Sequence, residues 1–274
     1  MIKSRFWSTA ATQVLMVALC VIISVPFLVV FFNSLKAKGP ASLMELSLPS
    51  VFQWDNYAVA IERGRLFTSF LNSMIYAVVG TLGTILVTAP AAFVLSRRAG
   101  KTTAFFYPFI ALGIMLPTNF VALISVMQFL HLMNSHFGMV VLFIAANVSF
   151  STFIIYGFVG SIPRAMDESA AIDGAKPMRL FFTVILPLLQ PVIATVSLLT
   201  FIGIWNDFMT PLYVLNSSAA WPLTLSIYSF FGRYSQDWHL VFADVVLTVL
   251  PVFVVFLVGQ KAIVSGMVSG AVKG

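Results

Sequence analysis

The chain has 274 residues, of which 60% are hydrophobic and only 9% are charged, and its mean hydropathy is +1.00. This composition excludes a soluble globular protein, because soluble domains carry about 25% charged residues. The net charge of +6 requires no nucleic-acid partner, since an excess of Lys and Arg in short cytoplasmic loops accounts for most of it.

Six apolar segments are predicted to cross the membrane as helices. Runs without a charged residue follow Arg5, Arg65 and Arg179, and each exceeds the roughly 20 residues that a spanning helix needs. The uncharged run after Lys101 is too long for one helix, and the polar stretch at 131–138 divides it. The first run lacks a small-residue cleavage pattern, which indicates a retained helix and not a signal peptide. We expect spans at about 10–34, 69–95, 104–130, 138–160, 188–210 and 241–260 of a single membrane domain, residues 1–274.

The unequal distribution of Lys and Arg predicts the orientation of these helices. Both termini fall on the same side of the membrane, together with ten of the fifteen basic residues. These ten are Lys3, Arg5, Arg97, Arg98, Lys101, Arg164, Lys176, Arg179, Lys261 and Lys273. By the positive-inside rule this side is the cytoplasm, so we expect the loop 161–187 and the tail 261–274 to be cytoplasmic.

The sequence Gly100-Lys101-Thr102, in the first cytoplasmic loop, matches the end of a phosphate-binding loop motif. That motif also needs a glycine five positions before Gly100, where this chain has Leu95, and a surrounding βα unit, which is missing. We therefore interpret the sequence as a basic turn. The chain shows no means of hydrolysing ATP by itself.

Residues 161–187 form a polar, charged segment between two spans. Ser161 as a cap, Pro163 in the first turn and Gly174 as a left-handed end predict a short helix, and a second helix is expected to restart at Pro177. A linker that lies on the membrane surface would favour Lys and Arg over the paired acids found here. We interpret the segment as the docking site of a partner.

Two carboxylates lie near the outer ends of predicted spans. Because a charge inside the membrane costs roughly 2.5–3.5 kcal/mol on insertion scales, Asp207 and Asp244 should face a cavity, a partner or the interface. A substrate path and plain interfacial solvation both remain open for them. The amides could likewise line a polar path, or they could form hydrogen bonds between neighbouring helices. These amides are Asn119, Gln128, Asn147 and Asn206.

Other segments argue against further spans and against a metal site. Residues 208–232 are uncharged, but Pro211, Pro222 and the polar residues between them predict an outer loop and not a seventh span. Cys20 is the only cysteine, and the histidines at 131 and 136 have no carboxylate or thiol neighbour, so we expect no metal to be bound.

The segment 161–187 resembles the cytoplasmic loop of the membrane subunits of ABC importers. Their signature, E-A-A, three residues, G, then I-x-L-P, is matched here by Glu168, Ala170, Ala171, Gly174, Ile185, Leu186 and Pro187. The resemblance implies an all-α fold of six transmembrane helices, the type I importer permease fold. It also implies that a coupling helix between helices 4 and 5, which includes Ser169 and Asp173, contacts a separate ATPase.

The C-terminal half carries two more resemblances. Residues 260–274, Q-K-A-I-V-S-G-M-V-S-G-A-V-K-G, resemble the ending of the second permease subunit of maltose-type systems, and W-N-D-F-M-T-P-L at 205–212 is a further match. In that family the tail extends toward the ATPase, which implies this role for Gly266, Gly270, Lys273 and Gly274. From the small side chains alone we expect the tail to be flexible. The family's contact with the binding protein corresponds here to Phe231, Gly232, Arg233 and Tyr234.

These observations together predict a permease subunit, not an enzyme, of a binding-protein-dependent ABC importer for a sugar or polyol, in the cell membrane of a prokaryote. The resemblance implies four kinds of partner besides membrane lipid: the substrate, a second homologous permease subunit, a cytoplasmic ATPase dimer that uses ATP and Mg, and an extracytoplasmic solute-binding protein. The chain itself is expected to bind no cofactor. An intramembrane enzyme would need converging catalytic groups at membrane depth, which the sequence does not offer. A membrane scaffold stays an alternative, although it leaves the segment 161–187 unexplained.

Overall fold

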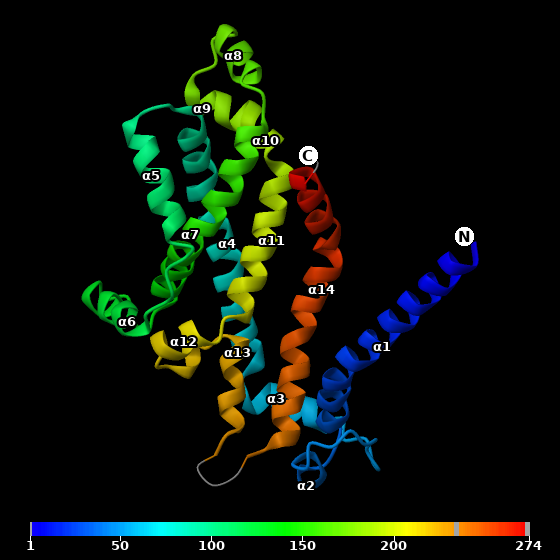
Figure 1. Ribbon diagram of the computed structural model, residues 1–274. Coiled ribbons are helices and arrows are strands. Elements are labelled where there is room, and N and C mark those ends of the chain that lie inside the picture. Colours follow the sequence, from blue (N-terminus) through cyan, green and yellow to red (C-terminus); the bar gives the residue numbers. More distant parts are fainter. Residues whose placement is uncertain (1, 233–235, 272–274) are drawn as a thin grey trace. The chain divides into compact units, whose positions relative to one another are not determined.

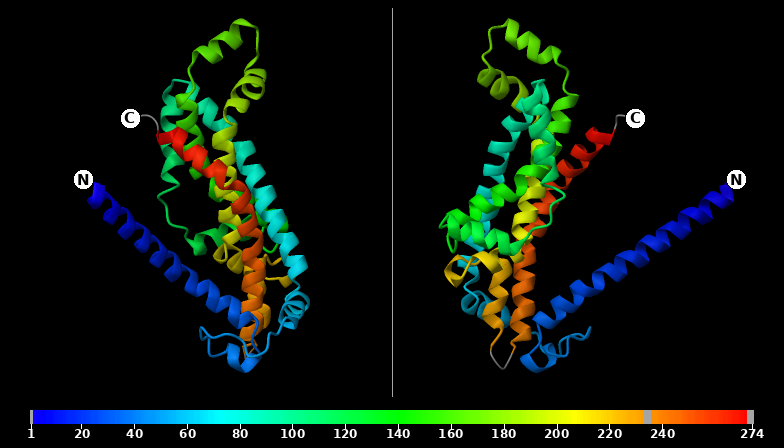
Figure 2. Two further views of the ribbon diagram at one scale, coloured as in Figure 1. Left: turned by 90° about the vertical axis from the view of Figure 1, so that its right-hand side faces the viewer. Right: turned by 60° about the vertical axis from the view of Figure 1, so that its left-hand side comes forward.

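A computed structural model describes residues 2–232 and 236–271, and the side chains of residues 12–232 and 236–260. The described chain is built from helices joined by loops, with one isolated β-bridge between Phe231 and Gln236 (Figures 1 and 2). It divides into two units, Met1–Phe67 with Ser226–Leu250, and Thr68–Leu225 with Pro251–Gly274. The predicted all-α class is therefore confirmed.

The first unit contains the long apolar helix α1 and the short helices of two loops that the sequence predicts to be external. Its elements are α1 (Ile2–Ser34), α2 (Lys38–Ala41), α3 (Asp55–Arg63), the 3₁₀ helix η3 (Ile227–Phe230) and the beginning of α14 (Trp238–Ala271). The apolar side chains of α1 in Thr12–Ser34 are largely exposed, which suits a helix whose surroundings are lipid or another protein.

A buried lysine fixes the loop that follows α1. Lys36 is only 4% exposed. Its Nζ donates to Asn33 Oδ1 at 3.0 Å, to the carbonyl oxygen of Glu45 at 2.9 Å and to Ser47 Oγ at 2.9 Å. Asn56 of α3 donates to the carbonyl oxygen of Lys36 at 2.9 Å. Because all three ammonium donors have acceptors, the buried charge is not left unsatisfied and holds the loop to the end of α1, while Asn56 holds the loop to α3.

The second unit is a bundle around α4, α7 and α11, which lie side by side (Figures 1 and 2). Its elements are α4 (Leu66–Arg97), α5 (Lys101–Leu112), α6 (Phe120–Phe129), α7 (His136–Ser161), α8 (Ala165–Ile172), α9 (Pro177–Leu180), the π-helix η1 (Phe181–Ile185), α10 (Leu186–Leu188), α11 (Gln190–Asn206), α12 (Met209–Val214), η2 (Ser218–Ala220) and α13 (Leu223–Ser226). Ala92, Val159 and Val196 are fully buried where the three long helices meet.

The predicted count of six spanning helices is not confirmed as such. Within the described residues, four helices are long and apolar enough to cross a membrane: Thr12–Ser34, Leu66–Arg97, His136–Ser161 and Trp238–Gln260. A fifth candidate is the pair Pro177–Leu188 and Gln190–Asn206, which is bent by 76°. The uncharged loop 208–232 forms only short helices, as the sequence predicts.

The predicted third span, 104–130, is wrong as one helix. The chain forms α5 and α6 instead, and residues 113–119 between them are not helical. Pro117 provides the physical reason, because proline lacks an amide hydrogen and disfavours helical geometry in the residue before it. Asn119 then caps α6, since its Oδ1 accepts a hydrogen bond from the amide of Ala122 at 3.1 Å.

The C-terminal tail is another correction. Residues 261–271 continue α14 as a helix, whereas small side chains predict a flexible end. Extending an existing helix avoids the cost of nucleation, which offsets the roughly 1 kcal/mol that each glycine costs in a helix. Gly266 and Gly270 thus lie in α14, while Lys273 and Gly274 are outside the described residues.

Candidate functional site

The polar segment between α7 and α11 contains the short helix that the sequence predicts, at slightly different bounds. α8 runs from Ala165 to Ile172, and its first turn holds Asp167 and Glu168, where carboxylates favour the helix dipole. The predicted cap is wrong, because Ser161 is the last residue of α7 and its hydroxyl donates back to a carbonyl oxygen of that helix at 2.7 Å.

The end of α8 follows the prediction for Gly174. This residue has φ +80°, in the left-handed region. The amide of Gly174 donates to the carbonyl oxygen of Ala171 at 3.0 Å, and the amide of Ala175 donates to the carbonyl oxygen of Ala170 at 3.0 Å. These two bonds are the Schellman arrangement, which satisfies the last carbonyl groups of a helix and reverses the chain. Ala170 and Ala171 therefore belong to the turn as well as to α8.

The return path is anchored in the bundle. α9 restarts at Pro177, as predicted, and continues through the π-helix η1 into α10. Phe181 and Ile185 of η1 are buried against α4, α7 and α11. A π-helix is a local widening that often occurs at functional sites. Of the predicted coupling residues, Ile185 thus lies in the core, while Leu186 and Pro187 line a cavity of about 390 Å³ beside α4.

In contrast to this anchored return path, α8 has no buried residue. Ile172 is 87% exposed, and the side chains of Glu168, Ser169 and Asp173 are also exposed. α8 protrudes from the bundle of the second unit (Figure 1).

An ion pair that the sequence did not indicate ties the beginning of α8 to the end of α4. Arg97 Nε lies 2.6 Å from Asp167 Oδ2, and both side chains are mostly buried. Arg97 Nη2 also donates to the carbonyl oxygen of Ile162 at 3.0 Å. The Nε–H is not aligned for a hydrogen bond to the carboxylate, so charge attraction makes this contact. Only the basic turn at Arg97 was visible in the sequence.

The predicted polar-path carboxylates have local partners. Asp207 Oδ1 accepts from the amide of Thr210 at 3.0 Å, in the first turn of α12. Asp244 in α14 is 1% exposed, and Ser226 Oγ donates to its Oδ1 at 2.7 Å. Each bond explains why the chain tolerates the carboxylate, and a role in a substrate path stays a prediction.

The predicted polar-path amides either form a hydrogen bond within their own helix or are exposed. Asn119 caps α6, and Asn147 donates to a carbonyl oxygen one turn earlier in α7 at 2.8 Å. Gln128 and Asn206 are exposed. The geometry gives these four side chains no common site.

Polar side chains in the first turns of α4 position the loop 219–223. Asn72 Nδ2 donates to two carbonyl oxygens of this loop at 2.9 and 3.0 Å, and the Tyr76 hydroxyl donates to a third at 2.8 Å. Ser73 Oγ accepts from a backbone amide of the loop at 2.8 Å. The sequence singled out none of these contacts, and only the polar character of Asn72 and Ser73 in an apolar span could have signalled them.

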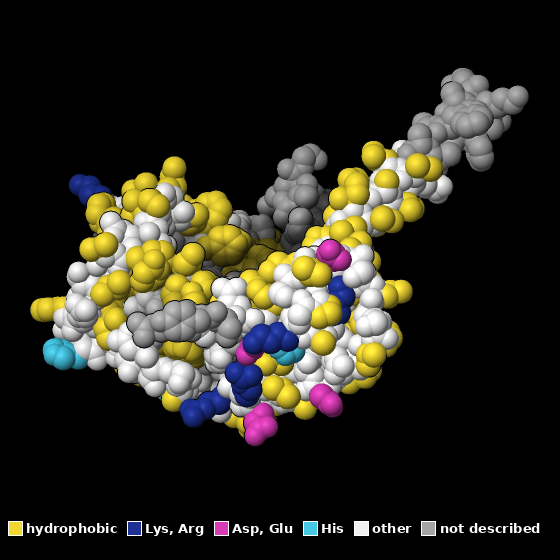
Figure 3. Space-filling view, turned by 90° about the horizontal axis from the view of Figure 1, so that it is seen from below, with side chains coloured by type: hydrophobic (Ala, Val, Ile, Leu, Met, Phe, Trp, Pro, Cys, Tyr) yellow, Lys and Arg dark blue, Asp and Glu magenta, His cyan; other side chains and the backbone are white. Residues whose placement is uncertain are grey.

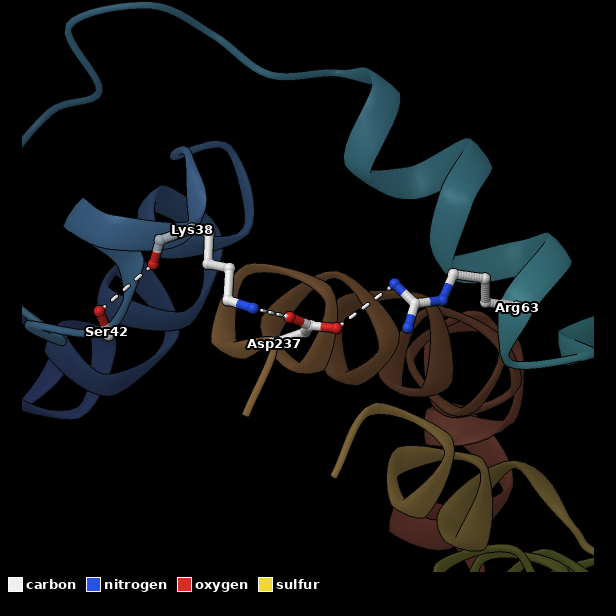
Figure 4. Close-up of polar contacts among 4 residues, drawn as sticks. All are labelled: Lys38, Ser42, Arg63 and Asp237. Carbon is white, nitrogen blue, oxygen red and sulfur yellow. Dashed lines mark hydrogen bonds and ion pairs between the residues drawn. The ribbon is translucent and has the colours of Figure 1, made fainter. Parts of the chain in front are cut away.

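A second charged cluster, in the first unit, joins α2, α3 and the residue that precedes α14. Lys38 Nζ of α2 is 2.6 Å from Asp237 Oδ1, and Arg63 Nη1 of α3 is 3.3 Å from Asp237 Oδ2 (Figure 4). The hydrogen bond from Lys38 holds the pKa of Asp237 below its ordinary value, although burial opposes this shift. On the face of the molecule drawn in Figure 3, Lys and Arg side chains gather beside acidic side chains. The cluster fixes the start of α14.

The predicted contact with a binding protein falls next to this cluster. Phe231 pairs with Gln236 through the β-bridge and packs edge-on against Trp238 at 5.8 Å between ring centroids. Gly232 is exposed. Arg233 and Tyr234 are outside the described residues.

Comparisons with known proteins agree on one family. A family model described as "Binding-protein-dependent transport system inner membrane component" matches residues 85–269, which include all of α8. The chain is 31% identical over 250 residues to a probable starch degradation products transport system permease protein of Thermoanaerobacterium thermosulfurigenes, covering 90% of this chain and 91% of that protein. It is 35% identical over 253 residues to a melibiose/raffinose/stachyose import permease protein of Bacillus subtilis, covering 91% of each.

A solved structure shows the same fold. The crystal structure of a bacterial ABC transporter involved in the import of the acidic polysaccharide alginate contains a chain that matches with a TM-score of 0.80. The match covers 93% of this chain and 95% of that one, at 23% identity. At this identity the likeness concerns the fold and not the substrate.

Proposed function

Because the chain belongs to the family of inner membrane components of binding-protein-dependent transport systems, we propose that it is the permease subunit of an ABC importer for a sugar or a sugar-like solute such as a polyol. A member of this family is a permease component and not an enzyme. The sugar class is supported by the relatives, which are named for the uptake of starch degradation products and of melibiose, raffinose and stachyose.

The observation that carries the proposal is the exposed helix α8 inside the segment that the family model matches. A permease without a nucleotide site must take its energy from another subunit. α8 is the element suited to that contact, because its small Ser169, Ala170 and Ala171 permit close approach and Glu168 offers a carboxylate to a basic or amide-rich groove. Ile172 would be covered by the same ATPase.

The remaining parts of the assembly follow from family membership. The family implies a solute-binding protein, an ATPase and a second permease subunit, so that the pathway forms between two permeases. In our proposal the ATPase is a cytoplasmic dimer, which binds ATP and Mg, and this chain holds neither. The end of α14, with Gly266 and Gly270, extends toward that dimer, and Phe231 and Gly232 face the binding protein.

The proposed topology keeps six crossings. Four single helices are long enough to span, the bent pair ending in α11 makes a fifth crossing, and α5 followed by α6 makes the sixth as a broken span. Non-helical backbone at membrane depth is tolerated where other protein surrounds it, which a second permease subunit would provide at residues 113–119. Both termini are then cytoplasmic.

Uptake by a deletion strain tests this function. Cells that lack the chain should fail to accumulate a radiolabelled sugar, for which melibiose, raffinose and malto-oligosaccharides form the first panel, and expression of the chain should restore uptake. The ATPase should co-purify with the restored chain. If uptake of every sugar in the panel is the same with and without the chain, the assigned sugar class is wrong.

A further inference from the structure

A groove of about 640 Å³ lies between the end of α4 and the beginning of α5. Its walls are apolar and include Val94 of α4 and Phe106 and Ile110 of α5. Its polar lining comes only from the turn that joins the two helices and from the first turn of α5, at Arg98, Gly100, Thr102 and Thr103. The groove therefore has an apolar body and one polar end.

The polar end carries uncompensated positive charge. Arg97, in the same turn, is paired with Asp167, but Arg98 and Lys101 have no carboxylate partner in the part of the chain that the structure describes. No acidic residue lines the groove. An anion at this end would thus meet Arg98, which lines the groove, and would lie near Lys101, which stands between the lining residues Gly100 and Thr102 in the chain. A cationic group there would meet no counter-ion.

The depth of the groove matches one leaflet of a bilayer. From Thr102 to Ile110, which both line it, α5 rises by roughly 12 Å at 1.5 Å per residue. Half of the hydrocarbon core of a bilayer is about 15 Å thick. A ligand that fills the groove is accordingly an alkyl chain with an anionic head, and a compact soluble anion would leave the apolar walls empty.

We propose that this groove binds an anionic phospholipid of the cytoplasmic leaflet, with its phosphate at Arg98 and Lys101 and one acyl chain between α4 and α5. Basic pockets between transmembrane helices on the cytoplasmic side are suited to such head groups. The proposal rests on the proposed function only for the orientation of the membrane, because the contacts from Arg97 to Ile162 and Asp167 place the turn at the same end of this unit as α8.

The chemistry favours a phospholipid over a nucleotide, although Gly100-Lys101-Thr102 resembles part of a phosphate-binding loop. The apolar walls have no donors or acceptors for a base or a ribose. A zwitterionic lipid is disfavoured because no carboxylate is present for its amine.

Native mass spectrometry of the purified complex, titrated with dioleoylphosphatidylglycerol or dioleoylphosphatidylcholine, tests the site. We expect one phosphatidylglycerol to bind more tightly than phosphatidylcholine. Removing each cation should weaken binding about fivefold, so Arg98→Gln with Lys101→Gln should weaken it roughly 30-fold. The control Arg65→Gln makes the same change in the other unit and should leave binding unaltered. Ala91→Phe, which fills the groove and keeps both cations, should also weaken binding.

A phosphatidylglycerol with a photoreactive acyl chain locates the lipid independently. We expect its cross-links at residues 90–110. Cross-links only to the second permease subunit, displacement of the lipid by excess inorganic phosphate, or full binding by the double variant would each overturn the proposal. If the complex binds the lipid as expected but imports no sugar, the proposed function fails and the lipid site stands. If sugar is imported and the double variant binds the lipid normally, only the lipid site fails.

Discussion

Replacing Gly174 by valine should uncouple the chain from its ATPase while leaving membrane insertion intact. Gly174 has φ +80°, and a Cβ added there meets no atom within 4 Å. The penalty therefore comes from the backbone and not from crowding. A left-handed conformation costs an L-residue roughly 1–2 kcal/mol, and more for a β-branched one. If the turn opens, the two bonds to the carbonyl oxygens of Ala170 and Ala171 are lost as well.

The size of the effect follows from these terms. The native turn becomes less favourable by the backbone penalty alone, about 2 kcal/mol for the β-branched valine, because the two hydrogen bonds oppose opening of the turn equally in both chains. α8 has eight residues, which is too short for a helix to be stable by itself. A change of 2 kcal/mol corresponds to about 30-fold in the equilibrium between the native and the open turn, and the apparent affinity for the ATPase should fall by up to this factor.

Two variants make the assay specific. Gly174→Asn should retain most activity, because asparagine tolerates left-handed geometry. Gly157→Val in α7 is the matched control, since a Cβ there also meets no atom within 4 Å but the backbone is helical. The measurements are sugar uptake and co-purification of the ATPase. Normal uptake and ATPase yield in Gly174→Val would refute the reasoning, and so would an equal loss in Gly157→Val.

Three further predictions concern the rest of the chain. In a Cys20→Ser background, an impermeant thiol reagent should label intact cells carrying Ser218→Cys but not Lys176→Cys, and the reverse result would contradict the proposed topology. Deleting residues 266–274 should leave the helices inserted but lower ATP turnover stimulated by loaded binding protein, whereas unchanged turnover would make the tail a passive end. Asp237→Asn should lower the Tm of the purified complex at pH 7. The loss in free energy of unfolding should be no more than about 1 kcal/mol, because the paired cations are half exposed. Since the pKa of Asp237 is lowered in the folded chain, this difference should disappear as the pH falls below 3.8, and a constant difference would exclude the ion pairs as its cause.

Features that depend on local backbone chemistry could be predicted from the sequence. Gly174 closes α8 because only a residue without a side chain adopts left-handed geometry freely, and Pro177 restarts the chain because its φ suits a first helical turn. The prolines and polar residues of 208–232 likewise exclude a long helix. In each case the deciding atoms lie within a few residues of one another.

The features that the sequence did not reveal depend on distant atoms or on properties that hydropathy ignores. Hydropathy counts apolar side chains, so it treated 104–130 as one span although Pro117 breaks the backbone hydrogen bonds. The contact from Arg97 to Asp167 joins residues far apart in the chain, and no spacing rule pairs them. The same holds for Tyr76 and the loop 219–223.

The segment that contains α8 is attached to the bundle at both of its ends, so under the proposed function a movement of α8 would reach the bundle at two points. Its beginning is held to the end of α4 by the pair of Asp167 with Arg97. Its return path is held to the core by the buried Phe181 and Ile185, directly before α11. A partner that displaces α8 would therefore act on α4 and α11 together. Because packed cores move between discrete arrangements and do not deform continuously, such a displacement would shift whole helices, which alternating access requires.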